Sequence, residues 1–105
     1  MADEVKVLDA GNFDSFIGKG NVVIDFWAGW CGPCKILSPV VEEVASEVKG
    51  VKFGKVDIEK EGELAQRFQV MSIPTLIYYK DGEQVNRTTG ALGKDELEKE
   101  LKDSF

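Results

Sequence analysis

Val22-Val23-Ile24-Asp25-Phe26-Trp27-Ala28-Gly29-Trp30-Cys31-Gly32-Pro33-Cys34-Lys35 is the stretch that decides the fold of this chain. Its first six residues are almost continuously apolar, which is typical of a central strand buried on both faces. After the two cysteines, apolar residues recur at helical spacing as far as a glycine that can end a helix; they are Ile36, Leu37, Val40, Val41, Val44, Ala45 and Val48, followed by Gly50. We therefore expect a buried strand, a loop carrying both cysteines, and a long helix packed on the sheet.

Shorter elements extend this unit in both directions. Val5 and Val7 alternate with polar neighbours as in a strand, and helical or strand-like patterns follow at 12–17, 51–58, 64–68, 75–79, 85–88 and 95–101. The dipeptide Asp81-Gly82 predicts a hairpin between the last two strands. The order predicts an α/β fold, a mixed central sheet of about five strands flanked by about four helices. We expect one domain spanning residues 1–105.

Composition excludes several classes of function. Acidic residues outnumber basic ones by 19 to 13, the net charge is −6, and no basic cluster offers a nucleic-acid footprint. Neither a secretory signal nor an apolar run of about 20 residues is present, so we expect no membrane association and a reducing, cytoplasmic location. The chain has no histidine, which excludes Cys-His catalysis and metal sites that use imidazole.

Both cysteines of the chain lie in this one loop. A disulfide between Cys31 and Cys34 would close a very small ring, which stabilises a fold far less than a long-range bridge does. Thiol-disulfide exchange is a better reason for the pair, because the second thiol can resolve a mixed disulfide formed by the first. Two alternatives stay open at this point: a structural disulfide, and half of a four-cysteine metal site formed by dimerisation.

Asp25 is the unusual residue of the predicted central strand. A bare carboxylate between Ile24 and Phe26 would cost several kcal/mol if it were buried, so we expect burial to raise its pKa into a range useful for proton exchange. The alternative is a solvated residue at the end of the strand.

Four separated motifs, in this order, resemble the thioredoxin family over essentially the full chain. They are Asp25-Phe26-Trp27-Ala28 leading to Trp30-Cys31-Gly32-Pro33-Cys34-Lys35, then Lys55-Val56-Asp57, Ile73-Pro74-Thr75, and Gly90-Ala91. The resemblance implies a thioredoxin fold and a redox-active disulfide between Cys31 and Cys34. Two departures are Gly29, where many relatives carry a larger or charged residue, and Gly93, where an oxygen-bearing helix cap is usual.

The position of each cysteine predicts its role in the reaction. Cys31 precedes the helix, where unpaired amides and the positive end of the dipole stabilise a thiolate, so we expect it to be the nucleophile. Cys34 lies one turn inward, and we expect a less exposed sulfur that acts as the resolving thiol. Gly32 allows close approach of a client chain and Pro33 stiffens the first turn, so both tune the redox pair, although they can also be plain turn residues.

The resemblance implies further site residues. Asp25 would lie beneath Cys34 and transfer its proton, and Lys55 would lie near Asp25 and tune it, the alternative being an ordinary surface lysine. Pro74 would be cis and face the cysteines, with the backbone of Ile73 pairing with an extended client segment. An apolar docking rim around Cys31 would consist of Trp30, Ile73, Pro74, Gly90 and Ala91, with Met71 and Ser72 at variable rim positions that tune partner choice. Trp27 is expected to pack, and packing is also the alternative for Trp30.

The sequence thus predicts a general protein-disulfide reductase that needs no cofactor or metal beyond its own disulfide. Its expected partners are a thioredoxin reductase, using either a nicotinamide-linked flavin or a ferredoxin, and disulfide-containing client proteins, with the chain itself a monomer. The alternative is an interaction subunit that docks through the same surface and depends only on the redox state of the cysteines.

Overall fold

The computed structural model describes residues 4–105, and within that range the elements follow the predicted order. The strands are β1 (Val5–Val7), β2 (Asn21–Trp27), β3 (Val51–Asp57), β4 (Thr75–Lys80) and β5 (Glu83–Thr89). The helices are α1 (Phe13–Ile17), α2 (Gly32–Glu47), α3 (Gly62–Arg67) and α4 (Lys94–Ser104). The first helix thus begins one residue later than predicted, and the last two strands and the last helix each extend beyond their predicted bounds by one to three residues at an end.

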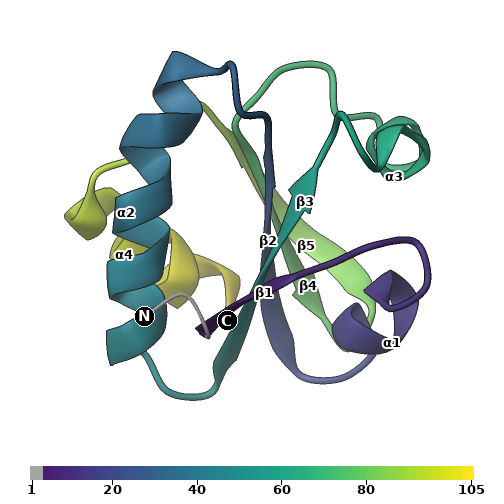
Figure 1. The fold of residues 1–105 in the computed structure, drawn as a ribbon. Helices are drawn as coiled ribbons and strands as arrows, with labels where there is room; N and C mark the ends of the chain where they lie inside the picture. The colour runs from purple at the N-terminus through teal and green to yellow at the C-terminus, as the bar shows by residue number, and fades with distance from the viewer. Residues whose placement is uncertain (1–3) are drawn as a thin grey trace.

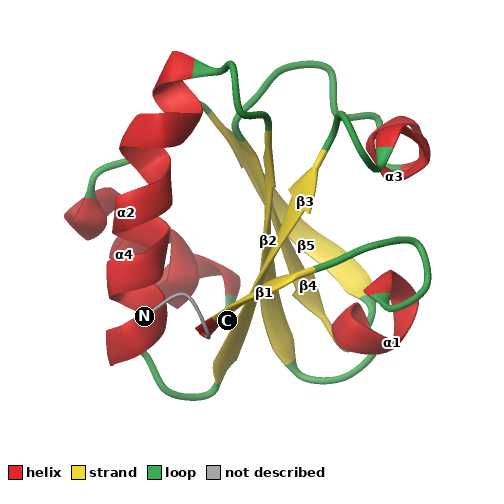
Figure 2. Cartoon of the chain, in the orientation of Figure 1, coloured by secondary structure: helices red, strands yellow, loops and turns green. Residues whose placement is uncertain are grey.

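All five strands form one mixed sheet in the order β1-β3-β2-β4-β5. β3 pairs in parallel with both β1 and β2, whereas β4 is antiparallel to β2 and to β5. The helices α2 and α4 cover one face of the sheet, and α1 and α3 cover the other (Figures 1 and 2). β2 is the central strand, as its continuous apolar run predicted, and the predicted α/β class is confirmed.

The sheet separates two hydrophobic cores. On the side of α2 and α4, buried residues of both helices pack on the sheet; they include Leu37, Val41, Val44, Leu97, Leu101, Val23, Leu76 and Tyr78. On the other side, aromatic and aliphatic residues pack beneath α1 and α3; they include Phe13, Ile17, Leu64, Val22, Ile24, Phe26, Ile77 and Tyr79. β2 thus contributes alternate residues to the two cores. Asp25 lies on the α2 face together with Val23, because side chains two residues apart in a strand point to the same side of the sheet.

Two apolar residues do not pack as predicted. Ile36 was expected on the buried face of α2 but is 66% exposed, because the buried stripe runs through Leu37, Val41 and Val44, and Ile36 lies about 100° away around the helix. Val7 was expected to alternate with Val5 as a buried strand residue, yet it is 68% exposed at the end of the short edge strand β1.

The predicted hairpin between β4 and β5 is confirmed. Both turn residues have a positive φ, 51° for Asp81 and 88° for Gly82, as a two-residue hairpin turn requires. The Asp81 carboxylate also accepts the Gly20 amide at 2.7 Å, and the Asp81 amide donates to the Gly20 carbonyl at 2.9 Å. The turn is thereby tied to the start of β2, at the opposite end of that strand from the cysteines.

Candidate active site

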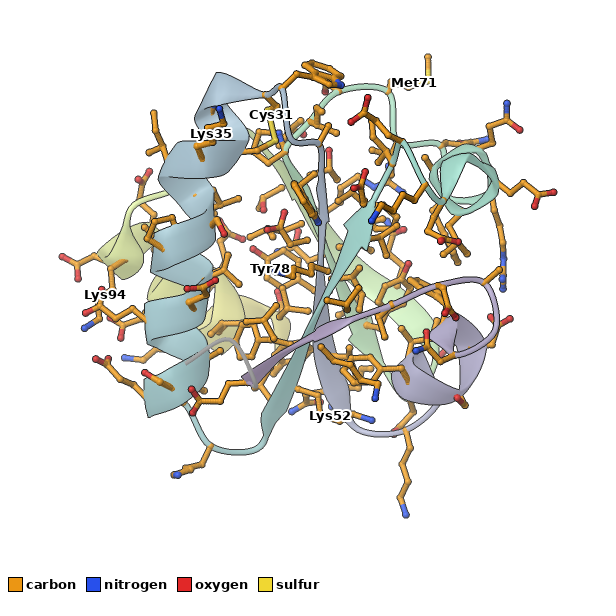
Figure 3. The ribbon with its side chains drawn as sticks, viewed as in Figure 1. Cys31, Lys35, Lys52, Met71, Tyr78 and Lys94 are labelled. Atoms are coloured by element: carbon orange, nitrogen blue, oxygen red, sulfur yellow. A yellow bond between two sulfur atoms is a disulfide. The ribbon has the colours of Figure 1, made fainter. Side chains whose placement is uncertain are left out.

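The two cysteines lie where β2 ends and α2 begins, at the top of the molecule in Figure 3. They form a disulfide with their Cα atoms 5.3 Å apart. The Cys31 amide donates to the Ala28 carbonyl at 3.2 Å, and the Lys35 amide donates to the Cys31 carbonyl at 3.3 Å. Main-chain hydrogen bonds therefore join the loop to the first turn of α2 and fix the position of Cys31.

Cys31 is the N-cap of α2, and its own sulfur caps the helix. Its backbone is extended, with φ −90° and ψ 114°, and its Sγ accepts the Cys34 amide at 3.2 Å. Pro33 lies in the first turn, where its missing amide removes no helical hydrogen bond. An amide directed at Sγ, together with the positive end of a 16-residue helix, stabilises negative charge on Cys31 more than on Cys34.

The expected difference in exposure between the two cysteines is absent from the disulfide form. Cys31 and Cys34 are each 4% exposed. Their sulfurs are bonded to each other, and Ala28, Trp27, Ile58 and Ile73 pack around both. Burial therefore does not distinguish the two residues in this oxidation state, whereas the helix-capping geometry does.

The segment that faces the disulfide contains Ile73 and Pro74. The Ile73–Pro74 peptide bond is cis, as the resemblance implied. The Ile73 carbonyl oxygen lies 3.8 Å from Cys31 Sγ, a contact rather than a hydrogen bond because a disulfide sulfur carries no proton. The Gly90 amide donates to the Pro74 carbonyl at 2.8 Å, and Gly90 has a φ of 92°, a conformation that favours glycine. Three predicted rim residues are thus joined beside Cys31.

The other predicted rim positions are open to solvent. Trp30 is 66% exposed although it directly precedes the buried Cys31, so packing alone does not account for this large side chain. Ala91 and Ser72 are exposed, and Met71 is 92% exposed. A set of exposed apolar side chains around a disulfide is suited to contact with another polypeptide.

Asp25 is buried in the middle of the sheet. Its side chain is 4% exposed, and in register it lies between Lys55 of β3 and Leu76 of β4. Burial raises the pKa of Asp25 to about 7, and the positive charge of Lys55 partly opposes that increase. Among residues 4–105, Oδ1 of Asp25 has no hydrogen-bond partner. The predicted buried carboxyl is therefore present, on the same face of the sheet as α2, and the alternative of a solvated residue is wrong.

Lys55 is half-buried and pairs in register with Asp25 across β2 and β3. Its Nζ lies 5.8 Å from the centre of the Trp27 ring, within the range of a cation–π contact. Together with Trp27, Asp57 and Lys60 it also lines a cleft of about 330 Å³ open to solvent beside β1 and β3. Lys55 therefore lines a cleft at the surface while its positive charge acts on the buried Asp25.

Sequence reasoning missed two residues of the site. Ala28 is fully buried against the cysteines, and its carbonyl holds the Cys31 amide. Ile58 packs against the same pair, and its amide donates to the Trp27 carbonyl at 3.0 Å. Parallel pairing of Trp27 with Asp57 brings Ile58 to the end of β2, a signal that could be used only once the strand order is known.

Other kinds of site receive no support from the described part of the chain. Between residues 4 and 105, no cluster of three or more histidine, cysteine or acidic side chains is arranged to hold a metal ion. None of the helices in that range combines the length and apolar character needed to cross a bilayer.

Comparison with known proteins agrees with this geometry. The family model named Thioredoxin matches residues 4–103. The chain belongs to the thioredoxin family. Like other members it is a thiol-disulfide oxidoreductase that reduces protein disulfides, and the Cys31–Cys34 bond is its redox-active disulfide. Thioredoxins work without a bound cofactor, in company with disulfide-containing substrates and a reductase.

Individual thioredoxins are similar along most of the chain. A thioredoxin of Chlamydia caviae is 53% identical over 93 residues, which cover 89% of this chain and 91% of that protein. A thioredoxin of Mycobacterium bovis is 46% identical over 101 residues, covering 94% and 87%. The crystal structure of the Malassezia sympodialis thioredoxin superposes with a TM-score of 0.88 at 33% identity, over 95% of this chain and 90% of that one. The predicted thioredoxin fold is confirmed.

Proposed function

We propose that Cys31 is the nucleophile that attacks the client disulfide. The single observation that carries this assignment is the Cys34 amide directed at Cys31 Sγ at 3.2 Å, at the start of α2. The Cys31 thiolate forms a bond to one client sulfur, the client S–S bond breaks, and the other client sulfur leaves as a thiolate that takes a proton from water. The product of this step is a mixed disulfide between Cys31 and the client.

Cys34 then resolves the mixed disulfide. Its thiol gives up a proton to the Asp25 carboxylate, and the new thiolate attacks Cys31 Sγ, which releases the second client sulfur as a thiolate and leaves the Cys31–Cys34 disulfide. Support for Asp25 as the proton acceptor comes from its burial on the α2 face and its pKa of about 7. Lys55 tunes this group from the neighbouring strand. Gly32 and Pro33 hold the two sulfurs at bonding separation.

The client docks on the rim around Cys31. Trp30, Ala91 and Gly90 offer contact area, and the backbone of Ile73, presented by Pro74, pairs with an extended client segment. This assignment is supported by the exposure of Trp30 and by the contact of Ile73 with Cys31. Met71 and Ser72 lie farther out and adjust which clients fit.

The remaining proposals concern the surroundings of the protein. We assign residues 1–105 to one thioredoxin domain that acts as a monomer in the cytoplasm, without a metal or cofactor. A separate thioredoxin reductase returns the disulfide to the dithiol after each turnover. The need for a separate reductase follows from the chemistry, because a protein that reduces many client disulfides needs a continuous supply of electrons.

Replacement of each cysteine in turn tests the mechanism. In Cys34→Ser the first step proceeds and the second cannot. We therefore expect covalent adducts with insulin and no turnover, with a thioredoxin reductase rather than a free dithiol as the electron source, because a free dithiol would itself cleave the mixed disulfide. The matched control Cys31→Ser is expected to form no adduct. Continued turnover in Cys34→Ser would contradict the mechanism. Survival of a cellular role in that variant without turnover would favour the interaction-subunit alternative, which the family membership does not favour.

A further inference from the structure

Met71 is the most exposed of the large apolar side chains in the described part of the chain, at 92%. Figure 3 shows it projecting from the molecule at the end that carries Cys31. The sequence contains two methionines, Met1 and Met71, and Met71 lies two residues before Ile73, whose carbonyl contacts Cys31. A thioether this open to water contributes almost no burial to the fold and is accessible to small oxidants.

The backbone that presents Met71 is held on both sides. Arg87 donates to the Phe68 carbonyl at 2.6 Å and to the Gln69 carbonyl at 3.1 Å. The Val70 amide donates to the Ala65 carbonyl at 2.9 Å. On the other side, the Thr75 hydroxyl donates to the Ser72 carbonyl at 2.6 Å. A chemical change at the Met71 side chain can therefore alter the docking rim while these contacts, and the fold, stay as they are.

We propose that Met71 is a site of reversible oxidation by peroxides, and that its sulfoxide weakens the docking of clients. The Met71 sulfur attacks one oxygen of hydrogen peroxide, the O–O bond breaks, an S–O bond forms, and the other oxygen leaves as water; the thioether loses two electrons and peroxide gains them. A sulfoxide reductase using a dithiol reverses the change, giving thioether, disulfide and water. The effect on clients rests on the docking rim of the proposed function.

The direction of the effect follows from the chemistry of the two side chains. The thioether is apolar and adapts to irregular apolar surfaces, whereas the sulfoxide is strongly polar and must lose water to occupy the same contact. We expect the loss in affinity to raise the KM for an apolar client by about threefold to tenfold, with kcat unchanged because the sulfur chemistry at Cys31 is untouched.

Peptide mapping tests the modification itself. The protein is kept in its disulfide form, treated with hydrogen peroxide and digested with trypsin, so that residues 68–80 form one peptide with Met71 as its methionine. We expect this peptide to gain one oxygen atom at a rate within about threefold of N-acetylmethionine amide, as for a fully exposed side chain. Methionine sulfoxide reductases A and B with dithiothreitol should remove it. An unmodified 68–80 peptide under conditions that oxidise the model compound would overturn the proposal.

A matched pair of variants tests the effect on docking. The measured quantity is the ratio of kcat/KM for insulin reduction after and before peroxide, with each protein compared with itself. We expect the ratio to fall about threefold to tenfold in the wild type through KM, and to stay near one in Met71→Leu, which is apolar but resists oxidation. Untreated Met71→Gln, which mimics the polar sulfoxide, should show the higher KM.

The outcomes separate this inference from the proposed function. A wild-type ratio that stays at one, or an equal fall in Met71→Leu, would overturn the role of Met71. Absence of turnover in the untreated wild type would instead contradict the reductase mechanism, and the peptide mapping would still report whether Met71 is oxidised and restored.

Discussion

Asp25 couples the chemistry of the site to the stability of the fold. Its pKa is about 7 in the folded protein because burial disfavours the charged carboxylate, against an ordinary value of 3.8. Between these values the folded protein binds one proton more than the unfolded chain does, so the free energy of unfolding falls as the pH rises through that window. The contribution of Asp25 is therefore fully present at acid pH and lost near neutrality.

We expect this pH-dependent loss of folding stability to disappear when the Asp25 carboxyl group is removed. From about pH 4 to about pH 8, the free energy of unfolding of the wild type should fall by about 4 kcal/mol more than that of Asp25→Asn, since each unit of pKa difference is worth about 1.4 kcal/mol. Urea unfolding of the disulfide form, followed by tryptophan fluorescence, measures both proteins. Parallel pH dependences would show that Asp25 has no raised pKa.

Lys55 opposes the effect of burial on Asp25, because its positive charge favours the carboxylate. In Lys55→Met the pKa of Asp25 should rise further, so the pH midpoint for resolution of the mixed disulfide should move to more alkaline pH. Single-turnover release of client from the mixed disulfide, measured from about pH 5 to pH 9, reports this midpoint. Lys49→Met makes the same change in net charge at an exposed residue after α2 and should leave the midpoint in place. Equal midpoints in all three proteins would contradict the tuning role.

At the scale of elements, β3 approaches its neighbours closely at Gly54. A Cβ atom built there would lie 2.7 Å from Leu8 Cδ1, 3.0 Å from Phe16 Cε2 and 3.2 Å from Ile24 Cδ1. Gly54→Ala should therefore lower the free energy of unfolding by about 1–3 kcal/mol, because the neighbouring side chains must shift. Thermal and urea unfolding measure the change.

Gly62 provides the matched control for this substitution. It begins α3, and a Cβ there would meet nothing within 4 Å. Gly62→Ala should leave stability unchanged or raise it by up to about 1 kcal/mol, since alanine favours a helix. If the two substitutions had the same effect, close packing at Gly54 would not be the cause.

The sequence predicted elements well where one face or both faces of the element are buried. The continuous apolar run of β2 and the helical spacing of apolar residues in α2 identified the two elements that flank the cysteine loop. Val7 and Ile36 were misplaced because hydrophobicity alone does not tell where a sheet ends or which of two adjacent helical positions turns inward. These are consequences of tertiary packing.

The sequence likewise predicted some residues of the site and missed others. Cys31, Cys34 and Asp25 could be predicted because each is an unusual residue type for its local sequence. That Ile73 and Pro74 lie close to the cysteines was implied only by the resemblance. Ala28 follows β2 directly, but no sequence pattern shows that its carbonyl accepts the Cys31 amide. Ile58 has an ordinary sequence context and joins the site only through β2–β3 pairing. Arg87 supports the rim from β5 by hydrogen bonds to two carbonyls, which no sequence pattern indicates.

At the scale of the whole molecule, the sheet divides the core into two parts that should respond independently. Leu37 packs on the α2 side and Ile77 on the α1 side. Leu37→Ala should cost about 2–5 kcal/mol and Ile77→Val about 0.5–1.5 kcal/mol, and the double variant should show the sum within about 0.5 kcal/mol. Urea unfolding of the four proteins in the cycle measures the coupling.

A second cycle within one core provides the comparison. Ile24 and Ile77 lie opposite each other on β2 and β4 and share the core beneath α1 and α3. Ile24→Val combined with Ile77→Val should deviate from additivity by about 0.5 kcal/mol or more, because the two cavities adjoin. Equal coupling in the two cycles would mean that the sheet does not insulate one core from the other.

The anchoring of the segment around Met71 by Arg87 and Thr75 also offers a route to protein engineering. The side chains of Met71 and Ser72 are both exposed, and these backbone contacts do not depend on them. A library randomised at these two positions should therefore retain its expression yield and melting temperature. Selection from such a library for mixed-disulfide capture could then direct the same redox chemistry toward a chosen target.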